Sequence, residues 1–186
     1  FVCDNRHPLR WAVFGPGVLE KNPNLSGAQS VMDLAEPGAA TPLFPLAPDT
    51  TAASFIPKLM QNPHAGSFTS CCGLCFFTGD ALPRHRGSFF ICEPAQNLVH
   101  CRSVVETQVK LTSRPSAVGR EFLASPDQWF RPVFASNGPD GALYLCDMYR
   151  KYVDHPNYLP PEAVARLDFA AGKKRGRIWK VASRDR

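Results

Sequence analysis

Short apolar runs separated by polar turns shape the second half of the chain, and the clearest case surrounds a turn at Asn137–Gly141. The apolar run Phe130–Phe134 precedes this turn, and a second run, Ala142–Cys146, follows it directly. The turn contains a proline, an aspartate and two glycines, the residue types that close tight turns. Apolar runs of this length between turns predict β-strands. We therefore expect a strand, a tight turn and a buried strand that ends at Asp147, as in one blade of a β-propeller.

The same alternation divides the chain into four parts. Residues 1–14 predict a hairpin of a preceding blade, and residues 64–113 predict one blade of roughly four strands. Residues 119–181 predict the last blade and a closing strand. Residues 15–63 are broken repeatedly by proline, so we expect a long excursion there. An excursion of this length usually has a function of its own or covers another part of the domain.

Within these parts the pattern predicts individual elements. Strands are expected at Ser30–Leu34, Ser88–Glu93, Leu98–Val105, Thr107–Thr112 and Gly176–Val181. The segment Pro160–Ala171 predicts a short helix, because proline is tolerated in the first helical turn. Together the elements predict an all-β fold. It is a partial β-propeller of about two to three blades of four-stranded antiparallel sheets, with a long Pro-rich insertion.

Composition and charge narrow the function classes. The chain has 186 residues, 44% hydrophobic and 20% charged, which is typical of one globular domain. Of its net charge of +5, the segment Lys173–Arg186 carries +6 and the preceding residues −1. One basic end is not the basic, aromatic-lined face of a nucleic-acid binder, so no nucleic-acid partner is expected. No apolar run approaches the roughly 18 residues of a transmembrane segment.

The seven cysteines leave several alternatives open. Cys72 and Cys75 form a C-x-x-C pair, but Phe76 stands where a c-type haem attachment site has histidine. No second C-x-x-C follows, so zinc binding is weakly supported. The odd number means that at least one thiol stays free or pairs outside the chain. A disulfide among Cys71, Cys72, Cys75 and Cys92 could form in an oxidising compartment, and the sequence does not choose its pairing.

Candidate chemistry lies first at the tip of the N-terminal hairpin. Proton-transfer chemistry needs a general base and a cation that stabilises charge, and His7 and Arg6 have these residue types. Against this, Asp4 and Asn5 suggest a structural turn whose side chains bond the backbone. His64, before an Ala-Gly pair, could approach a ligand or simply be a loop histidine.

The second group of candidates lies on both sides of the turn at Asn137–Gly141. Arg131 lies in an apolar setting, so it should pair with an acid such as Glu93 or Asp147, or else contact an anion at the channel mouth. Asp147 could hold calcium through its oxygens, although no run of alternating carboxylates surrounds it. Tyr149 and Arg150, like the nearby 154–155 pair, could contact a ligand or only form salt bridges at the rim.

Several stretches of the chain resemble a known family. They are Asp4–Arg10, His64–Gly73, Gly79–Pro83, Arg86–His100, Glu121–Val133, Asn137–Arg150, His155–Glu162 and Gly172–Val181. In them the chain resembles the C-terminal part of the propeller in membrane-bound dehydrogenases of planctomycete-type bacteria. These are distantly similar to sugar dehydrogenases that use pyrroloquinoline quinone. Cys101 and Cys146 depart from the family pattern. Since earlier blades are lacking, the chain looks like a fragment of about two and a half blades.

The resemblance implies a periplasmic or cell-surface protein that oxidises a sugar or alcohol. Electrons would pass to a c-type haem domain outside this chain, which longer relatives often carry after helical repeats. Pyrroloquinoline quinone and calcium are the implied cofactors. On this hypothesis His7 is the base, Arg6 and Arg131 stabilise charge, His64, Tyr149 and Arg150 contact the cofactor, and Asp147 binds calcium. The alternative is a non-catalytic propeller that binds a glycan or a protein and scaffolds appended domains.

Overall fold

The structure is a computed structural model that describes residues 1–15, 17–25, 30–47, 66–108, 110–153, 156–158 and 161–184. Its strands are β1 (Val2–Asp4), β2 (His7–Ala12), β3 (Val31–Asp33), β4 (Cys72–Phe76), β5 (Ser88–Glu93), β6 (Leu98–Glu106), β7 (Leu111–Pro115), β8 (Leu123–Ala124), β9 (Pro132–Asn137), β10 (Leu143–Asp147) and β11 (Arg177–Val181). Short 3-10 segments are η1 (Pro23–Leu25), η2 (Gly38–Ala40), η4 (Pro83–His85), η5 (Pro94–Gln96) and η6 (Pro156–Tyr158). The α-helical content of the described residues is a single turn, α2 (Pro161–Val164).

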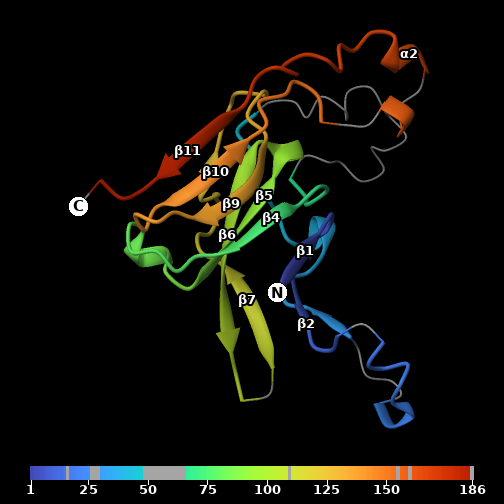
Figure 1. Ribbon diagram of the computed structural model, residues 1–186, viewed down its shortest axis with the longest axis vertical. Helices are drawn as coiled ribbons and strands as arrows, with labels where there is room; N and C mark the ends of the chain where they lie inside the picture. Colours follow the sequence, from blue (N-terminus) through green and yellow to red (C-terminus); the bar gives the residue numbers. More distant parts are fainter. Residues whose placement is uncertain are drawn as a thin grey trace.

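The strands form three antiparallel sheets, which confirms the predicted all-β, partial propeller-like fold (Figure 1). The first sheet has the order β1-β2-β3 and the last has the order β11-β10-β9. The middle sheet has five strands, in the order β4-β5-β6-β7, with β8 also paired to β6. The sheets therefore hold three, five and three strands rather than a uniform four.

Local hydrogen bonds explain where elements depart from the predicted ranges. The expected strand Thr107–Thr112 is wrong at its start, because the Thr107 amide donates to the Lys110 carbonyl over 3.0 Å and closes a turn there. The chain re-enters the sheet only at β7. The helix expected over Pro160–Ala171 is only α2. Asp168 accepts a bond from the Ala170 amide through its side chain, at 2.9 Å, which favours a turn over continued helix.

The main core lies between the middle sheet and the last sheet. Fully buried Phe77, Phe90, Leu143 and Leu145 pack together there. The two sheets approach so closely that Gly73 (φ +58°) has no room for a side chain. A Cβ on it would lie 2.6 Å from both the Phe134 Cα and the Val133 carbonyl oxygen. Glycine is thus required twice over, by its backbone conformation and by the contact.

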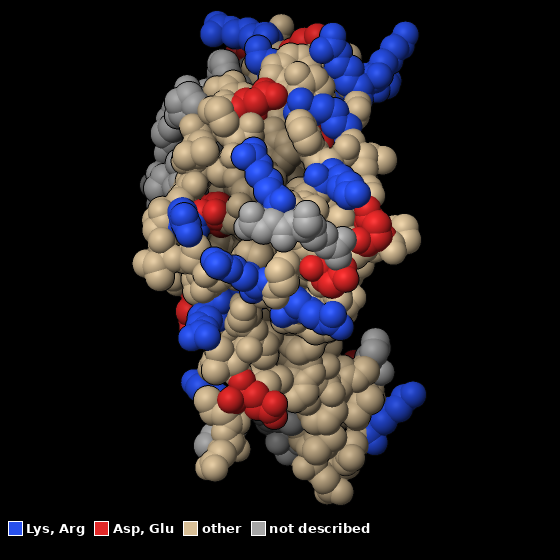
Figure 2. Space-filling view, turned by 90° about the vertical axis from the view of Figure 1, so that its left-hand side faces the viewer, with Lys and Arg blue, Asp and Glu red and all other residues tan. Residues whose placement is uncertain are grey.

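A smaller apolar cluster of Leu9, Leu34, Ala35 and Phe89 joins the first sheet to the middle sheet. None of the described helices is long and apolar enough to cross a membrane. On the face drawn in Figure 2, groups of Lys and Arg side chains alternate with acidic and uncharged surface. That surface resembles the mixed charge of an ordinary protein exterior.

Candidate functional site

A pocket with polar side chains arises where two strands share one edge of β6. The C-terminal half of β6 pairs with β7, from Arg102 opposite Pro115 onward. Its N-terminal half pairs with β8, where Val99 lies opposite Leu123. Between these pairings the Ser116 amide still donates to the Cys101 carbonyl over 2.8 Å, and residues 117–122 bulge away from the sheet, so no strand is paired to this edge at His100. A pocket forms under this bulge.

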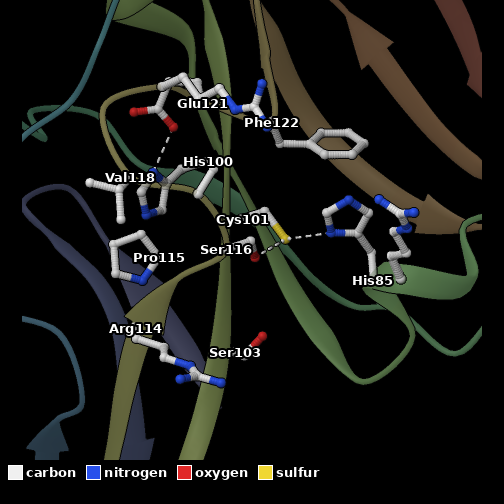
Figure 3. A pocket seen from close by; sticks show the side chains of 13 residues that line it. His85, His100, Cys101, Ser103, Arg114, Pro115, Ser116, Val118, Glu121 and Phe122 are labelled. Carbon is white, nitrogen blue, oxygen red and sulfur yellow. Dashed lines mark hydrogen bonds and ion pairs between the residues drawn. The ribbon is translucent and has the colours of Figure 1, made fainter.

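The pocket has a volume of about 690 Å³, which is within the range of small-molecule sites. It is lined by Arg84, His85, His100, Cys101, Ser103, Arg114, Pro115, Ser116, Ala117, Val118, Arg120, Glu121 and Phe122. Figure 3 shows two groups of polar side chains meeting there, one around His100 and one around Cys101. His100 and Cys101 are consecutive in β6, so their side chains lie on opposite faces of the sheet. A ligand at the exposed edge of β6 could therefore contact both groups.

The first group is a buried carboxylate–imidazole pair. His100 Nδ1 lies 2.6 Å from Glu121 Oε2, and the two side chains are 3% and 1% exposed. On the other side of the ring, Nη1 of Arg102 lies 3.4 Å from His100 Nε2. Arg102 is held in turn by the hydroxyl and the carbonyl of Ser113. A neutral imidazole that donates to Glu121 and accepts from Arg102 satisfies both ring nitrogens.

Burial lowers the pKa of Arg102 to about 10, and the Glu121 charge acts in the opposite direction. Arg102 is therefore charged at neutral pH, and it balances the charge of Glu121 across the ring of His100. The Glu121 carboxylate also accepts a bond from the Phe44 amide at 3.1 Å. This network fixes the floor of the pocket.

The second group is formed by Cys101, Ser116 and His85. The Ser116 hydroxyl donates to Cys101 Sγ over 2.9 Å, and His85 Nδ1 lies 3.6 Å from the same sulfur. Burial raises the pKa of Cys101 to about 11. Burial also lowers the pKa of His85, with a further contribution from Arg84. At neutral pH the pair is a thiol beside a neutral imidazole, not the thiolate–imidazolium pair of a cysteine nucleophile.

Three arginines make the rim of the pocket positive. Arg84, Arg114 and Arg120 are exposed, and they come from η4, β7 and the bulge. No carboxylate of the described residues forms an ion pair with any of the three. Their donors are therefore available to an anionic ligand, which arginine binds in a bidentate manner.

The hairpin residues expected to carry catalysis lie elsewhere, in the first sheet. His7 Nδ1 is 2.9 Å from Asp33 Oδ1 on β3, and Arg10 Nε is 3.0 Å from the same oxygen. The Arg6 carbonyl accepts a bond from the Gly38 amide, and Asn5 adopts a positive φ of 44° at the turn. These contacts are those of a structural turn. Among the described residues, none of them links Arg6 or His7 to Arg131.

Arg131 is buried, at 2% exposed, and its guanidinium bonds main-chain carbonyls. It donates to the Pro94, Arg150 and Lys151 oxygens at 2.8, 3.0 and 2.7 Å. The expected link to Asp147 is present, but it runs through the Arg131 amide at 2.8 Å. The other candidate acid, Glu93, accepts bonds from Thr69 and Ser70 instead.

Asp147 has a donor set that does not fit calcium. Besides the Arg131 amide, its oxygens accept from the Tyr149 amide, the Arg177 guanidinium and the Trp179 indole, at 2.8 to 3.1 Å. Calcium requires several oxygen ligands with free lone pairs, whereas this carboxylate is already surrounded by donors. Among the described residues, no three His, Cys, Asp or Glu side chains are grouped so that they could hold a metal ion.

Tyr149 and Arg150 belong to the same structural cluster as Arg131 and Asp147. The centroid of the Tyr149 ring lies 3.8 Å from Cζ of the Arg177 guanidinium. The backbone of Tyr149 has a positive φ of 50°. The Arg150 carbonyl is one of the acceptors of Arg131. The structure thus brings four of the candidates together where β9 begins and β10 ends. His64 lies outside the described residues, as do positions 154–155.

Sequence reasoning missed His85, His100 and Glu121. One signal was present: His100 stands inside an apolar strand sequence, where a buried imidazole needs a partner. Its partner, Glu121, is 21 residues away along the chain, and no local pattern joins the two.

Comparison with known proteins gives one match. No curated protein and no solved structure matches the chain. A family model described as Domain of unknown function (DUF7133) matches residues 1–185. The match covers the three sheets and the pocket, and the chain therefore belongs to this family.

Proposed function

We propose that this protein takes part in the oxidation of a sugar or an alcohol, and that the pocket beside β6 binds the substrate. The observation that carries the proposal is the meeting of a neutral histidine, His85, with three exposed arginines at one cleft. A hydroxyl oxidation needs a proton acceptor and a cation that stabilises developing negative charge, and both are present. The resemblance of the sequence to membrane-bound dehydrogenases supports the same reaction class.

In this proposal His85 accepts the hydroxyl proton. Its lowered pKa keeps the imidazole unprotonated at neutral pH, as a base requires. In the tautomer whose Nδ1–H donates to Cys101 Sγ, the other ring nitrogen is left as the acceptor. The Ser116 hydroxyl holds the sulfur from its other side and so orients the ring indirectly. Arg84, Arg114 and Arg120 are the candidates to bind an anionic group of the substrate or cofactor.

The implied quinone cofactor fits the charge of this pocket. Pyrroloquinoline quinone carries carboxylates, which Arg84, Arg114 and Arg120 would hold. When bound, such a quinone accepts the two electrons of the oxidation. Asp147 does not fit the implied calcium, so no step of the proposal uses that ion. Electrons would leave toward a c-type haem domain outside this chain, in an extracytoplasmic compartment.

A non-catalytic propeller that binds a glycan or a protein is the second candidate. One observation favours it: the side chains of Arg131 and Asp147 both bond main-chain groups, and His7 pairs with Asp33 of the same sheet. Under this alternative the arginine rim would bind an anionic partner and no oxidation would follow. Nucleic acid is not the proposed partner under either candidate.

The test is dye reduction by the purified protein supplied with pyrroloquinoline quinone and calcium, over a panel of sugars and alcohols. We expect reduction with the wild type and a loss of about 100-fold or more in kcat for His85→Gln, as for removal of a general base. The matched control is His7→Ala, which should change kcat less than about twofold, since His7 contacts Asp33 instead.

Two other outcomes are informative. Activity lost in His7→Ala and kept in His85→Gln would contradict the pocket assignment and locate catalysis at the hairpin tip. No activity of the wild type on any substrate would favour the binding scaffold. In that case, binding of an anionic glycan that weakens in Arg114→Gln would support the scaffold function directly.

A further inference from the structure

Two cysteines from distant parts of the chain meet where the first sheet contacts the middle sheet. Cys3 lies on β1, and Cys71 immediately precedes β4. The Cys71 amide donates to the Asn5 carbonyl over 2.8 Å, and the two residues form an antiparallel bridge. The backbones are therefore held side by side at this point, independently of any side-chain contact.

The side chains share one apolar cluster. Cys71 is buried with Phe68, Ile91 and Leu98, and Cys3 packs against the same cluster while remaining half-buried. The two thiols are within hydrogen-bonding reach of each other. This contact lowers the pKa of Cys3 and raises that of Cys71, and it is the largest cause of both shifts.

We propose that Cys3 and Cys71 form a disulfide bond when the protein is in an oxidising compartment. The inference is independent of the reaction proposed for the pocket. The oxidant is a small-molecule disulfide such as oxidised glutathione. The Cys3 thiolate attacks one of its sulfurs, so a mixed disulfide forms and one glutathione leaves.

The Cys71 sulfur then completes the exchange. It loses its proton and attacks the Cys3 sulfur of the mixed disulfide, forming the Cys3–Cys71 bond and releasing the second glutathione. Overall, two electrons and two protons pass from the two cysteines to one glutathione disulfide. Once Cys3 is in the mixed disulfide, its charge no longer opposes deprotonation of Cys71.

Four of the remaining cysteines are poorer partners. Cys72 and Cys92 are directly opposite each other in β4 and β5, but burial raises the pKa of both, that of Cys72 to about 12. Cys75 and Cys101 are also buried with raised pKa values. Of the thiols with a shifted pKa, Cys3 has the only lowered one, so it is the best attacking group.

The disulfide would fasten the first sheet to the rest of the molecule. Its loop would enclose residues 3–71, which include β2, β3 and the Pro-rich segment. Closing so long a loop restricts the unfolded chain strongly, so oxidation should raise the Tm.

The test is thiol mapping of the full chain after equilibration with a glutathione redox buffer, followed by alkylation under denaturing conditions. We expect two fewer alkylated cysteines than in the chain reduced with dithiothreitol. Mass spectrometry should find the tryptic peptide Phe1–Arg6 linked to the peptide that contains Cys71. The link should vanish in Cys3→Ser and in Cys71→Ser, and persist in the neighbouring control Cys72→Ser.

Three results would overturn the proposal. The first is full alkylation of all seven cysteines after oxidation. The second is a link that persists in Cys71→Ser, since Cys3 would then pair with another thiol. The third is a disulfide that does not contain Cys3, such as one between Cys72 and Cys92. In the wild type, fragmentation of the linked peptide 59–84 should assign the bond to Cys71 rather than to Cys72 or Cys75, so the result does not depend on whether the variants fold.

Discussion

The close approach of β4 to β9 makes a quantitative prediction for Gly73→Ala. The substitution has two costs, which can be separated. The first is the positive φ of 58°, at which an L-residue costs roughly 1–2 kcal/mol. The second is the contact of the new Cβ with the backbone of Phe134 and Val133, at 2.6 Å. Backbone cannot rotate aside, so the sheets must separate, at about 1–3 kcal/mol as for other overpacked sites.

A matched control isolates the second cost. Gly87 has a similar positive φ, 81°, yet a Cβ there meets nothing within 4 Å. Gly87→Ala should therefore lose only the conformational part of the free energy of unfolding, about 1–2 kcal/mol. Gly73→Ala should lose about 2–5 kcal/mol, measured by urea denaturation of both variants and the wild type. The difference between the variants reports the packing of the middle sheet on the last sheet.

An equal loss of free energy of unfolding in the two variants would contradict this packing. That result would mean that β4 and β9 are not held as closely as the core indicates. A loss in Gly87→Ala alone would be equally damaging, because its surroundings are open.

Three further predictions concern buried and exposed charges. Arg131→Met should reduce the free energy of unfolding by about 3–5 kcal/mol, because it leaves buried carbonyls without donors. Equilibrium denaturation should show this loss, whereas the control Arg114→Met should leave the free energy of unfolding nearly unchanged. Asp147→Asn should lower the Tm in a melting experiment even when calcium is in excess, since its partners are amides and side-chain donors rather than a metal. The pKa of Asp140 is lowered to about 2, chiefly by Lys180, so the stabilisation by this exposed pair should be present above about pH 4 and be lost as the pH falls toward 2. Asp140→Asn should remove that part of the pH dependence of the Tm, and an unchanged acid limb would contradict the assignment.

The strands of the middle and last sheets were predictable because their signals are local. The turn at Asn137–Gly141 and the apolar runs beside it define β9 and β10 within a few residues. The short strand at Ser30–Leu34 also appears, as β3. Apolar length and turn chemistry suffice for these elements, since both are set by neighbouring residues.

The pocket could not be predicted in the same way. It exists because β7 and β8 share one edge of β6, and strand pairing over such distances leaves no periodic signal in the sequence. Arg131 shows a related limit. Its apolar neighbours correctly predicted that the guanidinium has buried acceptors. Main-chain carbonyl oxygens can satisfy a guanidinium as well as a carboxylate can, and no residue type marks such carbonyls in the sequence.

The edge of β6 that β7 and β8 share also separates the residues that set the register of the sheet from the residues whose sequence can vary. The bulge over the pocket is anchored at both ends by ladder pairs, at Pro115 on one side and Leu123 on the other. Insertions or substitutions between these anchors would reshape the pocket while leaving the register of the sheet unchanged. Ligand preference could thus diversify among relatives, or be redesigned in the laboratory, by exchanging one short segment, 117–120, while Ser116 and Glu121 keep their contacts with β6.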